Sequence, residues 1–282
     1  MLPAFILLLR EGLEASLVVS ILLAALHQMG KTREVRAVWI GVSLAVIGSI
    51  VGGVIIYSTV REYDDTTFQT IFETGTYAIA VVLLTTMTFW MQRHSRTLKK
   101  EITERASQAG SGFALGLLAF ITVGREGLES AVFALAFAFQ TSGILWLTGA
   151  ALGVLAAVGL CWAIYRMGYR LDFRLFFRYM GALLLIFAAG LVADTIQNLQ
   201  ELGWVSFGNA HLWSTAHLLS EDSMVGDMLH SFIGYAQSPT VLQFSLYLLF
   251  LAVVGGYFLY LTRKPGGKPT AATQTVAPAP RS

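Results

Sequence analysis

Seven apolar stretches, each long enough to cross a lipid bilayer, constrain this chain more than any other feature. A helix needs about 20 mainly apolar residues to cross a hydrocarbon core roughly 30 Å thick. The candidate spans are 2–28, 37–58, 68–91, 113–140, 143–165, 177–199 and 240–262. They are much longer than the alternating segments of roughly 10 residues that build a membrane β-barrel. The sequence therefore predicts an all-α membrane protein with seven transmembrane helices.

The composition excludes several classes of protein. Only 13% of the residues are charged and 55% are hydrophobic, whereas a soluble domain carries about 25% charged residues. This leaves too little polar surface for a soluble enzyme, a nucleic-acid-binding protein or a disordered chain. We therefore expect the lipid bilayer as a partner and no nucleic acid. The single cysteine, Cys161, excludes an internal disulfide and a cluster of thiolate ligands.

The basic residues predict the orientation in the membrane. In the seven-span arrangement, 16 of the 19 lysine and arginine residues fall on one side. By the positive-inside rule this side is cytoplasmic, so the N-terminus lies outside and the C-terminus inside. We expect the cytoplasmic (inner) membrane of a bacterium, with residues 263–282 as a disordered cytoplasmic tail. The tryptophans near span ends, typical of an interfacial aromatic belt, are Trp39, Trp90, Trp146 and Trp162.

A five-residue string, Arg-Glu-Gly-Leu-Glu, occurs twice, at 10–14 and at 125–129. The copies lie in the first and fourth candidate spans, three spans apart. Because three is odd, these two spans run in opposite directions, which indicates an inverted-topology repeat as found in many transporters. The permease domain, 1–262, then comprises repeat one (about 1–91), repeat two (about 113–199), an extracytoplasmic loop (about 200–239) and a seventh span (about 240–262).

Each motif places two glutamates three residues apart, so each pair projects from one face of its helix. These are Glu11 and Glu14 in the first copy and Glu126 and Glu129 in the second. A charge in the middle of the bilayer costs about 2.5–3.5 kcal/mol, so these side chains must face the protein interior. The motif glycines, Gly12 and Gly127, fit either a close approach of the two motif helices or ordinary packing of small residues.

The charge balance of the motifs favours a metal site. Arg10 and Arg125 neutralise only two of the four carboxylates, so protons or a metal ion must supply the remainder. Carboxylate oxygens are ligands for hard cations such as iron, manganese, magnesium or calcium. The four glutamates are thus predicted metal ligands, with the two arginines orienting them as a second layer around the ion. We expect transport to proceed by rocking of one repeat against the other.

Alternative functions remain open at this point. The four carboxylates also fit a structural Arg–Glu network, a proton-coupled permease or antiporter for another divalent metal such as manganese, or a metal sensor that transports nothing. An intramembrane di-iron enzyme is disfavoured, because such bundles use a Glu-x-x-His pattern that no candidate span contains.

Further acids and histidines gather on the predicted outer side. Glu73 and Asp194 lie a short distance inside the third and sixth spans. A vestibule rich in acidic residues concentrates cations, and histidine with carboxylates binds iron, although a single loop histidine is more often only solvated. The candidate pathway residues are Glu73, Asp194, His211, His217, Glu221, Asp222, Asp227 and His230.

At its two Arg-Glu-Gly-Leu-Glu motifs the sequence resembles the oxidase-dependent iron permeases, which include fungal high-affinity iron permeases and bacterial EfeU-type transporters. Members of this family carry Arg-Glu-x-x-Glu in the first and fourth of seven spans. The resemblance implies uptake of iron, as Fe³⁺ or Fe²⁺, with Glu11, Glu14, Glu126 and Glu129 as iron ligands. It also implies no enzymatic activity, no permanently bound cofactor, and an extracytoplasmic iron oxidase, peroxidase or iron-donor protein as a partner. Some relatives are associated with lead, so the resemblance leaves another heavy divalent metal open.

Overall fold

The chain forms an assembly of α-helices in a computed structural model. The structure describes residues 2–61, 66–94, 98–138, 143–167, 173–215 and 223–263. Across these residues the single β-type pairing is an isolated bridge between His211 and Thr240. The helices are α1 (Leu2–Gln28), α2 (Val35–Arg61), α3 (Thr67–His94), α4 (Leu98–Gln108), α5 (Gly112–Ala138), α6 (Gly143–Met167), α7 (Phe173–Glu201), α8 (Met224–Ile233), α9 (Val241–Phe250) and α10 (Gly256–Arg263). A π-helical turn, Leu251–Gly255, joins α9 to α10.

Five helical segments are long and apolar enough to cross a membrane. They are Thr32–Thr59, Thr67–Arg93, Trp146–Ala163, Leu175–Glu201 and Val241–Arg263. Helix α2 shows why lipid must surround them, because it turns a row of large apolar side chains outward. This row includes Ile40, Leu44, Ile47, Val51 and Val54. Such a surface is stable in lipid and not in water, so the chain is a multi-pass membrane protein.

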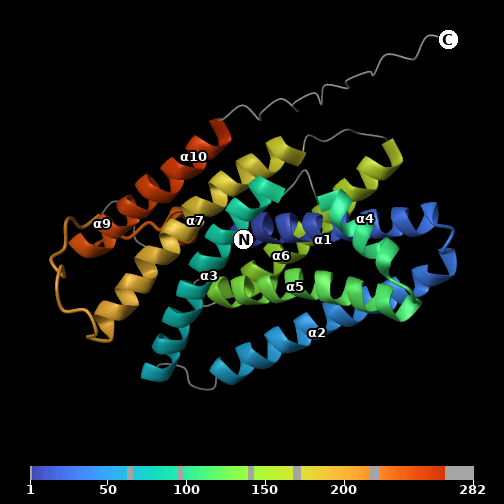
Figure 1. Cartoon of the computed structure of the whole chain (residues 1–282). Helices are drawn as coiled ribbons and strands as arrows, with labels where there is room; N and C mark the ends of the chain where they lie inside the picture. The colour runs from blue at the N-terminus through green and yellow to red at the C-terminus, as the bar shows by residue number, and fades with distance from the viewer. Residues whose placement is uncertain are drawn as a thin grey trace, which may run out of the picture.

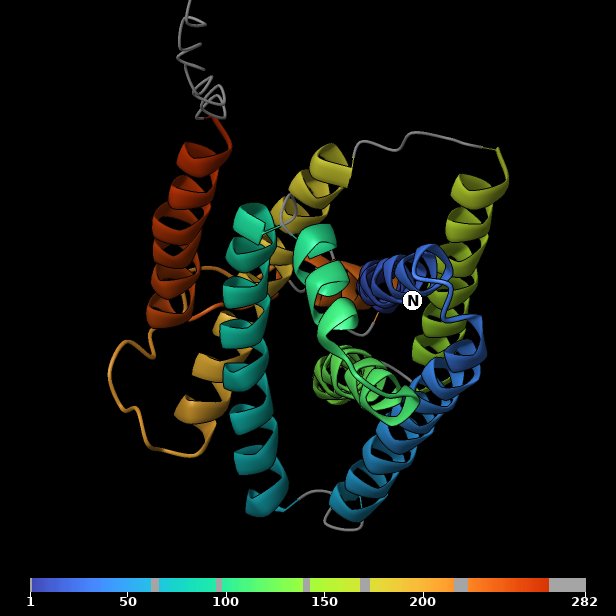
Figure 2. The same cartoon turned by 45° about the vertical axis from the view of Figure 1, so that its right-hand side comes forward.

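The two remaining predicted spans are the motif helices, α1 and α5. Each is a mainly apolar helix of 27 residues, and its Asp, Glu, Lys and Arg residues are the three that its motif supplies. The two helices lie side by side and run in opposite directions (Figure 1). Figure 2 views this pair nearly end-on, whereas α3 and α10 lie across the view, so the pair crosses these helices steeply.

Each motif helix packs most closely on a helix from the other half of the sequence. Helix α1 lies against α6, helix α5 lies against α2, and α3 lies against α7. The motif glycines make these contacts tight. A Cβ atom at Gly12 would lie 2.8 Å from the Cβ atom of Ala157 in α6, and one at Gly127 would overlap Ser49 in α2. These glycines therefore serve small-residue packing on α6 and α2, and the contacts at their Cα atoms are not with the other motif helix.

Helix α4 is an amphipathic helix that the span prediction left out. Its apolar side chains Ile102 and Ala106 are buried against Leu22 and Leu26 of α1. On its outer side Lys100 and Glu104 form an exposed ion pair with an N–O distance of 3.7 Å. The helix therefore covers the end of α1 at which the first two spans are connected.

The predicted loop 200–239 folds back onto the end of α7 and contains helix α8. The side chain of Thr240 accepts a hydrogen bond from the Gln243 backbone N–H, and the Gln243 side chain accepts one from the Thr240 backbone N–H. This reciprocal cap starts α9. The Thr240 hydroxyl also donates to Gln200 Oε1 at 3.0 Å, which fixes the start of α9 against α7.

Candidate metal site

Three of the four motif glutamates converge between α1 and α5. Glu11, Glu126 and Glu129 each offer one carboxylate oxygen, and these oxygens lie within 4.8 Å of one another. Glu14 is also buried but lies outside this group of three. The close approach of two antiparallel helices, each with glutamates spaced i, i+3, places the carboxylates around one point.

Both i, i+4 ion pairs that the motif spacing predicts are present. Arg10 Nε lies 3.1 Å from Glu14 Oε1, and its Nη1 donates to Glu11 Oε1 at 3.3 Å. Arg125 Nε donates to Glu129 Oε1 at 2.9 Å. Within the described residues Glu126 forms no ion pair. The two motifs therefore contribute four carboxylates and two guanidinium groups, a net charge of −2 when all are ionised.

Several buried polar atoms of the motifs have no hydrogen-bond partner among the described residues. They are Arg10 Nη2, Glu11 Oε2, Glu14 Oε1, Glu126 Oε2 and Glu129 Oε2. Glu14 Oε1 is still attracted to Arg10 by charge, without a hydrogen bond. More than about 90% of buried polar groups in proteins are hydrogen-bonded, so this group of unpartnered buried atoms at the two motifs is unusual. A cation or bound protons would satisfy the oxygens.

The two arginines differ in their environment. The side chain of Arg10 is 2% exposed, whereas that of Arg125 is 53% exposed. The Arg125 guanidinium lies over the ring of Trp90 in α3, 5.3 Å from the ring centroid, a cation–π contact. Sequence reasoning assigned Trp90 to an interfacial belt and missed this contact, since the residue lies near a span end.

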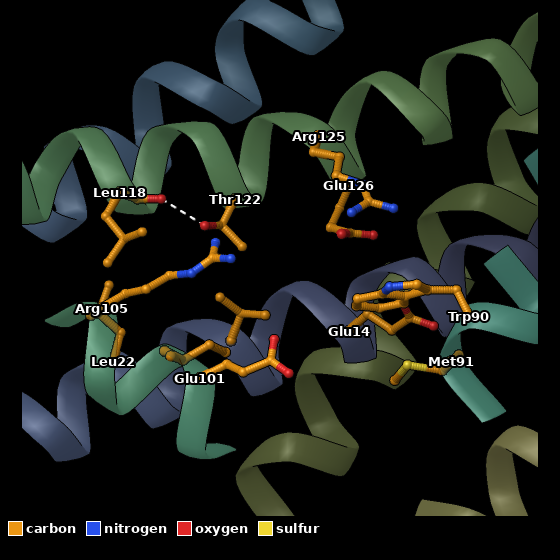
Figure 3. Close-up of a pocket in the computed structure, with 12 residues that line it drawn as sticks. Glu14, Leu22, Trp90, Met91, Glu101, Arg105, Leu118, Thr122, Arg125 and Glu126 are labelled. Carbon is orange, nitrogen blue, oxygen red and sulfur yellow. Dashed lines mark hydrogen bonds between the residues drawn. The ribbon is translucent and has the colours of Figure 1, made fainter. Parts of the chain in front are cut away.

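A cavity of about 140 Å³ leads from the motif carboxylates to α4. Glu14 and Glu126 lie at one end of this cavity, and Glu101 and Arg105 of α4 lie at the other (Figure 3). Sequence reasoning missed Glu101 and Arg105, because α4 was counted as part of a connecting loop. The helical period of its buried Ile102 and Ala106 was the available signal.

Two of the predicted pathway acids lie on α3 and α7, which pack against each other. Glu73 accepts a hydrogen bond from Gln69 Nε2 at 2.8 Å, and Asp194 is 7% exposed. His230 of α8 lies beside Asp194, with 3.8 Å between Nε2 and Oδ1. The structure thus places Asp194 beside His230, with Glu73 on the neighbouring helix α3.

The other predicted pathway residues are placed apart or not described. His211 is exposed, and its Nδ1 lies 2.9 Å from the carbonyl oxygen of Ser238. His217, Glu221 and Asp222 lie outside the described residues, and Asp227 lies in α8 with its side chain outside the description.

Comparisons with known proteins identify the family. Residues 1–265 match the family described as the iron permease FTR1 family. The "Ferrous iron permease EfeU" of Yersinia pestis is 34% identical over 284 residues, which cover 99% of this chain and 100% of the relative. The protein of the same name from Escherichia coli O6:K15:H31 is 36% identical over 256 residues, covering 89% and 92%. No solved structure matches the chain. The chain therefore belongs to the FTR1 iron permease family and is a membrane transporter, not an enzyme.

Proposed function

We propose that this permease imports ferrous iron across the cytoplasmic membrane through a site formed by Glu11, Glu14, Glu126 and Glu129. The observation that carries the proposal is the group of three converging carboxylates with unpartnered oxygens. Relatives of similar length are named for ferrous iron. Carboxylate oxygens suit this ion.

The charge of the site supports a divalent ion. Four ionised glutamates and two arginines leave −2, which one Fe²⁺ ion neutralises. Neutralising this charge stabilises the site, because an uncompensated charge in the low dielectric of a buried site is strongly unfavourable. Glu14 lies beside the three converging carboxylates and lines the cavity, so it is suited to receive the ion as it leaves them. Arg10 and Arg125 hold the carboxylates in place as second-layer groups.

The seven-span inverted repeat is part of the proposal. Helices α1 and α5 have 27 residues each and are about 40 Å long at 1.5 Å per residue. This length exceeds the hydrocarbon thickness of roughly 30 Å even when a helix is tilted. Helices α1 and α5 occupy equivalent positions in the two repeats, as do α2 and α6. The packing of α1 on α6 is therefore equivalent to the packing of α5 on α2. The tight contacts of Gly12 and Gly127 correspond in the same way, which supports a pseudo-two-fold relation. The distribution of basic residues supports a cytoplasmic C-terminus.

We place the entrance at Glu73, Asp194 and His230. These groups carry buried or half-buried carboxylate and imidazole ligands on the predicted outer side. The acid-rich segment with His211, His217, Glu221, Asp222 and Asp227 would concentrate cations before they enter. A donor protein such as an extracytoplasmic iron oxidase or peroxidase is proposed from the resemblance alone.

The test is uptake of iron-55 by cells that lack other iron importers and express single variants. Glu11→Gln, Glu126→Gln and Glu129→Gln should each abolish uptake at wild-type membrane abundance, whereas the exposed Glu104→Gln should leave it unchanged. Supplying iron as Fe²⁺ with ascorbate, or as Fe³⁺, identifies the oxidation state carried. Normal uptake by all three motif variants would overturn the proposal.

A proton antiporter is the second candidate, since protons would also satisfy the unpartnered oxygens. Purified protein in vesicles separates the two functions. An iron permease moves iron that manganese competes with poorly, and an antiporter moves another solute when only a pH gradient is applied.

A further inference from the structure

The cavity beside the motif site has one acidic group that the motifs do not supply. Glu101 of α4 points into this space, with its carboxylate directed toward Glu14 (Figure 3). Apart from the motif residues, Thr122 and the two charged residues of α4, the lining consists of Val18, Leu22, Trp90, Met91, Ile102 and Leu118. An ion that leaves Glu14 and Glu126 through this cavity therefore meets Glu101 as its next carboxylate.

The direction of Glu101 follows from how α4 is held. Ile102 and Ala106 are buried against α1 and α5, and Lys31 Nζ donates to the carbonyl oxygen of Ala109 just after the helix, at 3.1 Å. These contacts fix the rotation of α4 about its axis. Glu104, three residues along, is turned outward and pairs with Lys100. Glu101 forms no ion pair within the described residues, so its carboxylate remains available to a cation.

Arg105 lies at the same end of the cavity with its guanidinium directed toward Thr122 of α5 (Figure 3). A positive charge beside Glu101 opposes lasting occupancy of this position by a metal ion. The pair of charges therefore suits a position at which an ion binds briefly and is released, as transport requires.

We propose that Glu101 is the cytoplasmic station that accepts the iron ion from Glu14 and Glu126, with Arg105 promoting its release. This inference rests on the proposed function. It assigns α4, which connects the two repeats, a direct part in conduction, and it makes the cavity the route to the cytoplasm.

Uptake and binding, measured separately, test this role. Glu101→Gln should lower the maximal rate of iron-55 uptake by roughly tenfold, the lower end of the enrichment that acidic lining brings to a cleft. Binding of Fe²⁺ to the purified variant, measured by anaerobic titration calorimetry, should stay within about twofold of wild type, because the motif ligands are intact. Glu101→Asp should recover most of the rate, and the matched variant Glu104→Gln should behave as wild type.

Thiol labelling tests the route independently of transport. In a Cys161→Ala chain, a cysteine introduced at Thr122 should react with a membrane-impermeant maleimide added from the cytoplasmic side, and one at the fully buried Leu115 should not. Uptake by Glu101→Gln equal to wild type, or an unreactive Thr122→Cys, would overturn the exit route and leave the proposed function standing. Wild-type protein that carries no iron would instead overturn both.

Discussion

Replacement of Glu126 by glutamine should stabilise the metal-free protein while it abolishes the effect of iron. Glu126 is suited to this test because it is the motif glutamate without an ion pair in the described structure, so Glu126→Gln leaves no arginine unpaired. Its Oε2 atom is buried without a hydrogen-bond partner. A neutral amide of nearly the same shape removes a charge that the empty site does not compensate.

The size of the effect follows from the distances between the carboxylates. Oxygens of Glu11, Glu126 and Glu129 lie within 4.8 Å of one another, and two unit charges at that distance repel by about 3.5 kcal/mol at an effective dielectric of about 20. Glu126 faces two such charges, hence about 7 kcal/mol at most, because the arginine paired with each of these carboxylates offsets part of the repulsion. Protonating an ordinary carboxyl group at pH 7 costs only about 3.7 kcal/mol. Proton uptake by the empty site sets this upper limit, so the expected gain from glutamine is roughly 1–3.5 kcal/mol.

Thermal unfolding followed by tryptophan fluorescence measures this gain in detergent, under anaerobic conditions. At about 2–4 °C per kcal/mol, the metal-free variant should unfold roughly 3–10 °C above the wild type. Saturating Fe²⁺ should raise the midpoint of the wild type and leave that of the variant unchanged. The surface variant Glu104→Gln should match the wild type in both conditions. A lower midpoint for Glu126→Gln, or an undiminished response to iron, would refute the argument.

Three further predictions concern packing, capping and the entrance. Gly127→Ala should destabilise the protein by about 1–3 kcal/mol, because the added methyl group overlaps Ser49. Adding Ser49→Gly should recover part of this loss. If the double variant recovers nothing, the contact between Gly127 and Ser49 is not the cause. Thr240→Ala should lower the free energy of unfolding by about 1 kcal/mol through loss of the cap of α9, and an unchanged thermal midpoint would contradict this. Asp194→Asn should raise the iron concentration for half-maximal uptake without lowering the maximal rate, as expected of an entrance, and a change in the rate alone would contradict the assignment.

The membrane helices follow from the sequence because each needs only a long apolar run. Residues 68–91 and 177–199, for example, were predicted spans and lie within α3 and α7. Helix α4 was missed because it is only 11 residues long and has few apolar side chains. Its stability comes from burying Ile102 and Ala106 against other helices, and these contacts join residues far apart in the chain.

The side chains that share a face within each motif were predictable, but the geometry between the two motifs was not. The i, i+3 and i, i+4 spacings within each helix fixed which side chains share a face, and the ion pairs of Arg10 and Arg125 follow from them. The distances between the motifs depend on how α1 and α5 cross, so the separation of Glu14 from the other three carboxylates was not predictable. The contact of Trp90 with Arg125 likewise depends on the position of α3.

Each motif helix packs on a helix of the other repeat, and this packing limits how the two repeats can move relative to each other. A hinge between the halves would have to pull α1 off α6 and α5 off α2, including the contact at Gly127 where no gap remains. The expected rocking of one repeat against the other stays a prediction, and it would have to break these contacts. Two crossed bodies, α1 with α6 and α5 with α2, can instead slide along the face that they share, and that face holds the glutamates. A cross-link between α1 and α6 should thus permit transport, and one between α1 and α5 should stop it.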